Sequence, residues 1–234
     1  MTKLGSILLL ILLVVSPVFY SCGKDNLYSS VVQENNKQKA EDAIISGDYD
    51  SAISLLTSYI VENPTDYSAQ SMLANAYELK AGINLLDLFI KMSNNISTSK
   101  NNLYAVLNSF PTGDSINIGY INTALQILTA IPSASRTSDQ TYQIAVVNAA
   151  LAFLMTKMDI LDTSGTISTA LVVTMSMTDS NTIYNSLVNV QTIFNSLGVV
   201  AGSGSGSGIL LSIINGITVS GSSAGLITYL LANE

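Results

Sequence analysis

The chain has 234 residues, a formal net charge of −7 and only 11% charged side chains, compared with about 25% in a typical soluble domain. It has no histidine and a single cysteine, which excludes zinc sites of the usual kind and Ser-His or Cys-His catalytic pairs. The excess of acidic side chains makes nucleic acid a poor partner for most of the surface.

Residues 1–21 have the layout of a signal peptide. Lys3 supplies the positive start, residues 4–15 form an apolar run, and Ser16 and Pro17 break the run before the small Ser21. The run is shorter than the roughly 20 apolar residues that a transmembrane helix needs. We therefore predict a targeting segment that is removed from the mature protein.

Cys22 directly follows this segment, and its setting resembles the lipobox of bacterial lipoproteins, although Phe19 and Tyr20 stand where that family carries aliphatic and small residues. The resemblance implies cleavage before Cys22 and acylation of its sulfur, which attaches a protein to a membrane surface without a span. In many Gram-negative lipoproteins an aspartate after the cysteine retains the protein at the inner membrane. Gly23 at this position therefore implies the outer membrane, on its periplasmic face. The alternatives for Cys22 are an exposed free thiol and a retained signal anchor.

Residues 22–35 are expected to form a tether, and residues 36–132 a helical region with small and large side chains at regular spacing. The positions are Ala40, Ala43, Gly47, Tyr49, Ala52, Leu56 and Pro64. Their spacing resembles the tetratricopeptide (TPR) repeat, in which small residues let two antiparallel helices approach and larger ones fill the seam. Asp48 is expected to cap the second helix and Pro64 to end it. A generic helical hairpin is the alternative.

A second unit begins with Leu73, Ala74 and Tyr77. It departs from the pattern after Gly82, where residues 83–92 read as a continuing apolar helix rather than a turn and a second helix. One and a half repeats cannot cover their own apolar faces, so helices farther along the chain must do so. We expect residues 133–234, an apolar helical region, to supply them within one continuous domain.

Apolar spacing predicts further helices along the chain. One covers about 115–131 and ends at Pro132, and another starts at Thr137 or Ser138 and runs to about 161, so apolar that most of its circumference must be buried. The remaining helices are expected at about 165–178, 181–197, 208–215 and 223–232. The predicted fold is all-α, built from antiparallel helical hairpins that are TPR-like in the N-terminal half, with apolar C-terminal helices completing the core.

The C-terminal region carries almost no charge, since from Thr163 onward only Asp179 and Glu234 are charged. Residues 202–208 alternate glycine and serine and are predicted to be a mobile loop. Residues 209–231 are uncharged but interrupted by polar residues and glycines, which favours two short helices joined near 219–223 and packed on the domain. Insertion of this tail into the membrane, or its assembly into an oligomer, is the alternative.

Carboxylates are the remaining candidates for chemistry, and they fall in two close pairs, Asp48/Asp50 and Asp159/Asp162. The first pair suits the capping of a helix, and the second ends the apolar helix without the distal glutamate of a calcium loop. We assign both pairs structural roles. The sequence has no phosphate-binding loop, so we predict a protein that is not an enzyme and needs no cofactor or metal.

Two functions are compatible with this layout. The first is a helical scaffold for protein–protein interaction, held at the cell envelope by a lipid anchor, that binds a peptide or another envelope protein. This is what the resemblance to TPR lipoproteins implies, with Tyr59 and Tyr67 as candidate contacts. The second is a carrier of a hydrophobic small molecule or lipid, whose pocket would use flexible and aromatic side chains. The candidates for that pocket are Phe153, Met155, Met158, Met175 and Met177, which a buried core would equally explain.

Overall fold

The computed structural model describes residues 35–98, 102–162, 165–201, 206–219 and 221–232. The predicted signal peptide, Cys22 and nearly all of the predicted tether lie outside the described residues. Within these ranges the regular structure is helical apart from one isolated bridge between Leu161 and Ile167, so the all-α prediction is confirmed. The helices are α2 (Asn36–Ser46), α3 (Tyr49–Glu62), α4 (Tyr67–Lys80), α5 (Leu85–Thr98), α6 (Asn102–Ser109), α7 (Ser115–Ala130), α8 (Ser138–Ile160), α9 (Thr169–Thr174), α10 (Met177–Ser196), α11 (Gly206–Thr218) and α12 (Ser223–Ala232).

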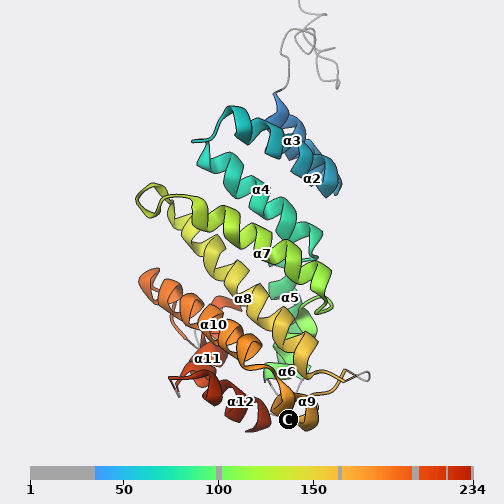
Figure 1. Ribbon diagram of the computed structural model, residues 1–234, viewed down its shortest axis with the longest axis vertical. Coiled ribbons are helices and arrows are strands. Elements are labelled where there is room, and N and C mark those ends of the chain that lie inside the picture. The colour runs from blue at the N-terminus through green and yellow to red at the C-terminus, as the bar shows by residue number, and fades with distance from the viewer. Residues whose placement is uncertain (1–34, 99–101, 163–164, 202–205, 220, 233–234) are drawn as a thin grey trace, which may run out of the picture.

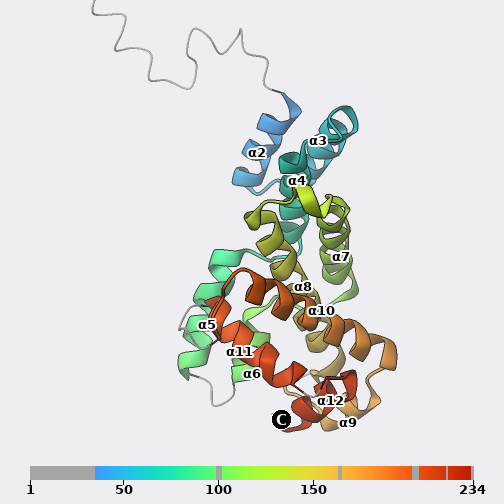
Figure 2. The same ribbon diagram turned by 90° about the vertical axis from the view of Figure 1, so that its left-hand side faces the viewer.

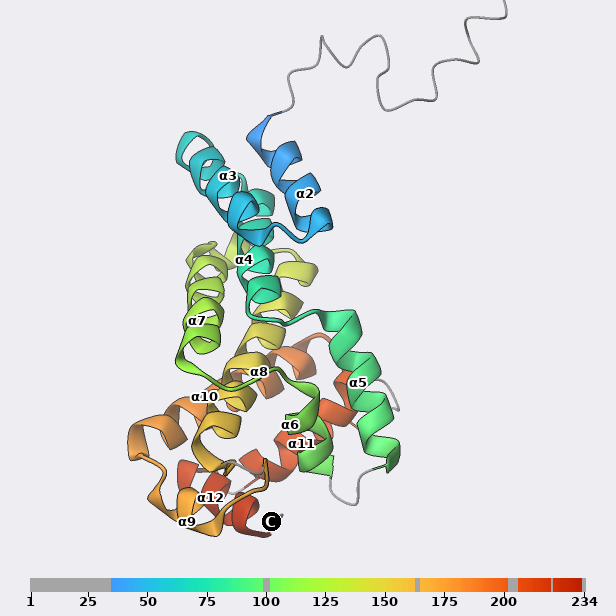
Figure 3. The same cartoon turned by 90° about the vertical axis from the view of Figure 1, so that its right-hand side faces the viewer.

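The helices form an elongated stack, with α2 and α3 at one end and α11, α12 and the C-terminus at the other (Figure 1). Along the stack α2 packs on α3, α3 on α4, α4 on α7, α7 on α8 and α8 on α10. The pair α5–α6 and the short α9 are inserted between members of this series. Seen from the two sides, α2 and α5 lie on one side of α4, and α3 and α7 lie on the other (Figures 2 and 3).

The first hairpin follows from local signals in the sequence. Asn35 forms a capping box with Gln38 at the start of α2, and Gly47 ends that helix with a φ of 81°, a left-handed conformation that glycine adopts without a steric penalty. Asp48 caps α3 as predicted, because its carboxylate accepts a hydrogen bond from the Ser51 amide at 3.1 Å. Helix α3 then ends at Glu62, two residues before Pro64.

The prediction that an apolar helix simply continues over residues 83–92 is wrong at its start. Helix α4 ends at Lys80, Gly82 takes a φ of 78°, and α5 begins only at Leu85. Helix α5 packs chiefly on α6, while the antiparallel partner of α4 is α7. Helices α4 and α7 therefore pack on each other although the pair α5–α6 separates them in the sequence, and the TPR-like arrangement stays a prediction.

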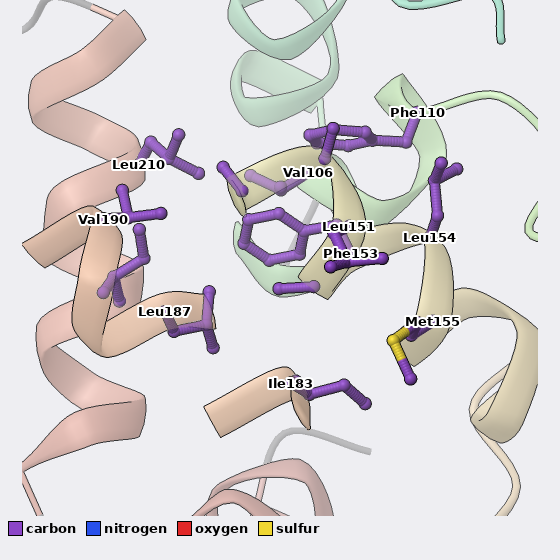
Figure 4. Close-up of a cluster of buried hydrophobic side chains, with 14 of the residues drawn as sticks. Val106, Phe110, Leu151, Phe153, Leu154, Met155, Ile183, Leu187, Val190 and Leu210 are labelled. Carbon is purple, nitrogen blue, oxygen red and sulfur yellow. The ribbon is translucent and has the colours of Figure 1, made fainter. Parts of the chain in front are cut away.

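Helix α8 forms the centre of the larger hydrophobic core. Its sequence is apolar on nearly every side, which suits a helix surrounded by protein, and Ala145 to Thr156 are buried without interruption. Figure 4 shows Phe153 among side chains of α6, α8, α10 and α11. Its ring lies 5.2 Å from that of Phe110, centroid to centroid. This burial confirms the prediction that most of the circumference of α8 is covered.

The C-terminal helices agree with the sequence except between residues 161 and 181. The helix predicted at 165–178 is reduced to α9, because Asp162 accepts hydrogen bonds from the amide and hydroxyl of Thr166 and holds a turn. Ser176 caps α10 by accepting from the Asp179 amide at 3.0 Å, so α10 starts four residues before the predicted 181. The predicted loop at 202–208 lies partly outside the described residues, and its last residues belong to α11.

The uncharged tail forms two helices, α11 and α12, as predicted. By length and composition, α8 is able to cross a membrane, and so is the pair Gly208–Thr218 with Ser223–Ala232 if the two are taken as one span. The pair is bent by 111°, and 78% of the apolar window of α8 is buried inside the protein. Buried side chains of the tail, among them Ile214, Leu226 and Leu230, belong to the same core as α8.

Candidate binding cleft between α4 and α8

A cleft of about 410 Å³ lies between α4 and the first turns of α8. Most of its lining residues carry hydroxyl, amide or carboxyl groups, but apolar atoms supply the larger share of the lining surface. The lining residues are Ser68, Ser71, Met72, Asn75 and Glu78 of α4, Leu85 at the start of α5, and Asp139, Tyr142 and Gln143 of α8.

The α4 wall of the cleft is one stripe of a helix. Ser68, Ser71, Asn75 and Glu78 are spaced by three or four residues, so their side chains lie on the same face. Ala69, Leu73 and Ala76 of α4 pack in the adjoining small core with residues of α2 and α3. The polar stripe lines the cleft because apolar residues of α4 pack in the small core on another face of the helix.

Four side-chain hydrogen bonds join α8 to this wall, and Glu78 accepts one of them. The Gln140 side chain donates to the Tyr67 carbonyl at 2.9 Å, and Gln143 donates to the Ser71 carbonyl at 3.2 Å. The Ser71 hydroxyl donates back to Gln143 Oε1 at 2.5 Å. The start of α8 is itself held by a capping box between Thr137 and Gln140. The cleft walls are therefore joined by specific polar contacts.

Glu78 is the buried acidic group of the cleft. Glu78 is only 2% exposed, and Gln143 donates a hydrogen bond to its Oε1 at 2.6 Å. Burial raises the pKa of Glu78 to about 7, an effect that the hydrogen bond from Gln143 opposes. At neutral pH this carboxyl group is therefore able to accept a hydrogen bond as an anion or donate one as an acid.

No lysine or arginine is among the residues that line the cleft. Most basic side chains in the described part of the chain have partners elsewhere. Lys37 pairs with Asp66 at 2.9 Å, Lys80 with Asp50, Lys91 with Asp87, Lys157 with the Phe110 carbonyl, and Arg136 with the Thr129 and Ile131 carbonyls. The charged groups lining the cleft, Glu78 and Asp139, are both acidic.

The two tyrosines predicted as partner contacts are partly exposed, and both also make contacts within the protein. The Tyr59 hydroxyl donates to the Asp66 carboxylate at 3.2 Å, which links α3 to the start of α4. Tyr67 packs against the large core, and its carbonyl accepts the bond from Gln140. Neither tyrosine is among the residues lining the cleft. The signal for the cleft was the polar stripe on α4, which the sequence alone does not distinguish from a solvated face.

The five residues considered for a hydrophobic pocket are not gathered around one cavity. Phe153 is 1% exposed and Met155 is also buried in the packed core, with Met175 half-buried against it. Met158 is 44% exposed and Met177 is 78% exposed. The five residues are thus divided between the packed interior and the surface. They do not form the pocket that a carrier would need.

The acidic pairs have separate surroundings. Asp48 caps α3 and Asp50 pairs with Lys80, whereas Asp159 has one buried carboxylate oxygen without a hydrogen-bond partner. Burial, followed by the nearby charge of Asp179, raises the pKa of Asp159 to about 6. Within the described residues no three acidic or cysteine side chains are grouped as metal ligands would be.

Comparison with models of protein families, with curated proteins and with solved structures finds no match to this chain. Its function is therefore inferred from the cleft and from the sequence.

Proposed function

We propose that the protein is a membrane-anchored scaffold of the bacterial envelope, which holds a polypeptide segment of another envelope protein in the cleft between α4 and α8. The observation that carries this proposal is the polar cleft itself, whose walls are joined by side-chain hydrogen bonds and whose lining includes a buried carboxyl group. A volume of about 410 Å³ falls in the range of roughly 300–1,000 Å³ that is usual for ligand sites.

The lining chemistry suits a peptide backbone. The side chains of Ser68 and Asn75 make no hydrogen bond within the described residues and line the cleft. An amide side chain both donates and accepts, so Asn75 matches the N–H and C=O groups of an extended segment. Met72, Leu85 and Tyr142 add apolar surface for the side chains of that segment. A site of this kind would select a polypeptide through hydrogen bonds to its backbone.

The anchor in this proposal is acylated Cys22, on the periplasmic face of the outer membrane. It is supported by the position of the only cysteine, directly after an apolar run and before a polar segment. The mature chain would then remain at the membrane surface and present the stack of helices to its partner in the periplasm.

Site-specific photo-crosslinking in the native envelope tests the scaffold. A photoreactive p-benzoylphenylalanine at Asn75 or Ser68 is expected to capture one defined polypeptide. The same group at Asn122, an exposed position on α7 outside the cleft lining, is expected not to capture it. Equal capture at both places, or none at either cleft position, would contradict binding in the cleft.

Mass spectrometry of the N-terminal peptide tests the anchor separately. We expect an acylated Cys22 at the new N-terminus, and Cys22→Ser is expected to release the protein from the membrane fraction. A membrane-bound Cys22→Ser protein that keeps residues 1–21 would instead support the retained signal anchor.

A further inference from the structure

We propose that the cleft recognises a cationic side chain, a lysine or arginine of the bound segment, and that Glu78 is the residue that pairs with it. This inference rests on the proposed function and names the chemistry of the segment that the cleft selects.

The geometry leaves one oxygen of Glu78 for a ligand. Gln143 donates to Oε1 at 2.6 Å, while Oε2 has no hydrogen-bond partner within the described residues. Among the described residues, Asp159 Oδ2 is the one fully buried side-chain oxygen that lacks a hydrogen-bond partner. Glu78 Oε2 also lacks a partner but is not fully buried. Since Glu78 also lines the cleft, we infer that Oε2 is the oxygen that a ligand in the cleft reaches. Burying a carboxylate without a partner carries a large desolvation penalty, and a cationic hydrogen-bond donor offsets more of that penalty than a neutral donor does.

The surrounding charges select the sign of the ligand. Asp139 lines the same cleft, and no basic side chain does. A carboxylate on a ligand would meet two acidic groups in a protein whose net charge is −7, whereas a cation meets only favourable charges. An anion or a phosphate group is therefore the wrong chemistry for this site.

The apolar part of the lining fits the stem of a long basic side chain. Lysine and arginine bury their methylene chain along apolar surface and place only the head group on a polar partner. Met72, Leu85 and Tyr142 supply such surface beside Glu78. The oxygens of Ser71 and Asn75 line the same cleft and are acceptors for the further N–H groups that an ammonium or guanidinium carries.

The ionisation of Glu78 gives the inference a signature. Because the pKa of Glu78 is raised to about 7, a cation that binds the carboxylate must displace a proton at lower pH, which weakens binding by about tenfold between pH 8 and pH 6. Asp139 and Tyr142 of α8 are the other titratable groups that line the cleft with Glu78. On α4 itself, Lys80 pairs with Asp50 of α3 and lies over the ring of Tyr120 of α7. A variant at Glu78 separates its contribution from theirs.

Methyl NMR on the full chain, labelled at methionine methyl groups and kept in detergent, tests the inference. The probes are the capped tripeptides Ac-Ala-Lys-Ala-NH₂ and Ac-Ala-Arg-Ala-NH₂, with Ac-Ala-Gln-Ala-NH₂ and Ac-Ala-Glu-Ala-NH₂ as neutral and acidic controls. Met72 lines the cleft and reports binding, and the exposed Met177 reports nonspecific effects. We expect a saturable shift at Met72 with the cationic peptides only, weaker by about tenfold at pH 6 than at pH 8.

Three variants make the result decisive. Glu78→Gln removes the charge with little change in shape and is expected to weaken binding of the lysine peptide at least tenfold and to abolish most of its pH dependence. Asp139→Asn removes the other acidic charge of the lining, which is exposed, and is expected to weaken binding by less than threefold. Glu78→Asp keeps the charge and is expected to retain measurable binding, which guards against a folding defect in Glu78→Gln. Equal shifts from the glutamine peptide, or unchanged binding in Glu78→Gln, would overturn the inference.

The same variants distinguish this inference from the scaffold proposal. If a partner crosslinks at Asn75 equally well in wild-type protein and in Glu78→Gln, the scaffold stands and recognition of a cation fails. If the lysine peptide binds through Glu78 but no polypeptide crosslinks in the envelope, the cleft recognises cations and the scaffold proposal fails.

Discussion

Helices α2, α3 and α4 meet over a small core of alanines and leucines, whereas α8 is packed on nearly all sides by larger aliphatic and aromatic side chains. The alanines of the small core let the helices approach closely but bury little apolar area per residue. Polar contacts supplement that core, such as the pair of Lys37 with Asp66 at 2.9 Å and the hydroxyl of Tyr59 on the same carboxylate. Around α8, Phe153 and Phe194 are fully buried instead.

The comparison explains where the cleft lies. Helix α4 belongs to both regions, because Ala69 and Leu73 are in the small core and Ala74 is in the large one. Its remaining stripe faces the start of α8 and carries the polar lining with Glu78. A binding site at this junction has a firmly packed helix on one side and a lightly packed group of helices on the other.

The largest effect is expected in the core around α8. Phe153→Ala removes a fully buried ring that packs on Phe110, and we expect the free energy of unfolding to fall by about 3–5 kcal/mol. Urea denaturation followed by circular dichroism measures this loss. Met177→Ala, at a 78% exposed position, is the matched control and is expected to stay within about 0.5 kcal/mol of wild type. A loss below about 1 kcal/mol for Phe153→Ala would contradict the description of α8 as the central core helix.

Glu78 is expected to lower stability at high pH. Its pKa lies at about 7 in the folded protein against an ordinary 4.5, so the folded state binds more protons than the unfolded state between these values, and stability falls as the pH rises through this window. Glu78→Gln lacks this loss. It should therefore become more stable than wild type above pH 7, by roughly 3 kcal/mol at most.

Denaturation curves of both proteins at pH 5 and pH 8 measure the difference. It is expected to be small at pH 5 and to grow toward pH 8. A constant difference across the range would mean that Glu78 is not the group that titrates. A buried acid that costs stability without a ligand is typical of a site retained for binding.

In the small core the loss is expected to remain local. Leu56→Ala empties a buried position between α2, α3 and α4 and is expected to cost about 2–3 kcal/mol. Because α2 and α3 contact the rest of the described chain chiefly through α4, the effect should be confined to α2 and α3. Hydrogen exchange is expected to accelerate by about 30-fold or more in these helices and to remain unchanged in α8. Ile45→Ala on the 84% exposed face of α2 is the control, and exchange that rises equally in α8 would show that the two cores unfold as one unit.

Local sequence signals predicted the helices well where the signal and the structure are both local. The helix expected at 115–131 is α7, ended before Pro132, and the uncharged tail forms the two helices expected from its glycines and polar residues. The helix expected at 165–178 was largely lost because the turn between Asp162 and Thr166 depends on side-chain hydrogen bonds rather than on apolar spacing.

Long-range pairing was not available from the sequence. Nothing in the spacing of α4 indicates that its antiparallel partner is α7 rather than α5, because the choice depends on which apolar faces meet after the insertion. The burial of Glu78 likewise depends on Gln143, which lies 65 residues away in the chain. A polar stripe on one helix lines a cleft only when a second helix lies beside it. For this reason the sequence indicates Tyr59 and Tyr67 as candidate partner contacts and does not indicate the residues that line the cleft.

The smallest effect comes from two glycines, one in each hairpin, that differ only in backbone conformation. A Cβ at either position would meet no atom within 4 Å, but Gly47 has a φ of 81° and Gly119 lies within the regular helix α7. Gly119→Ala is expected to stabilise the protein by about 0.5–1 kcal/mol because alanine loses less entropy in a helix. Gly47→Ala is expected to cost about 1 kcal/mol because alanine is strained in the left-handed region. For a chain of this size each change corresponds to a shift of about 2–4 °C per kcal/mol in the thermal midpoint, which calorimetry resolves. If both variants shift the thermal midpoint in the same direction, the left-handed conformation of Gly47 does not contribute to the stability of the turn between α2 and α3. Shifts in opposite directions would show that this turn depends on backbone conformation, in contrast to the α8 region, where packing of large side chains determines stability.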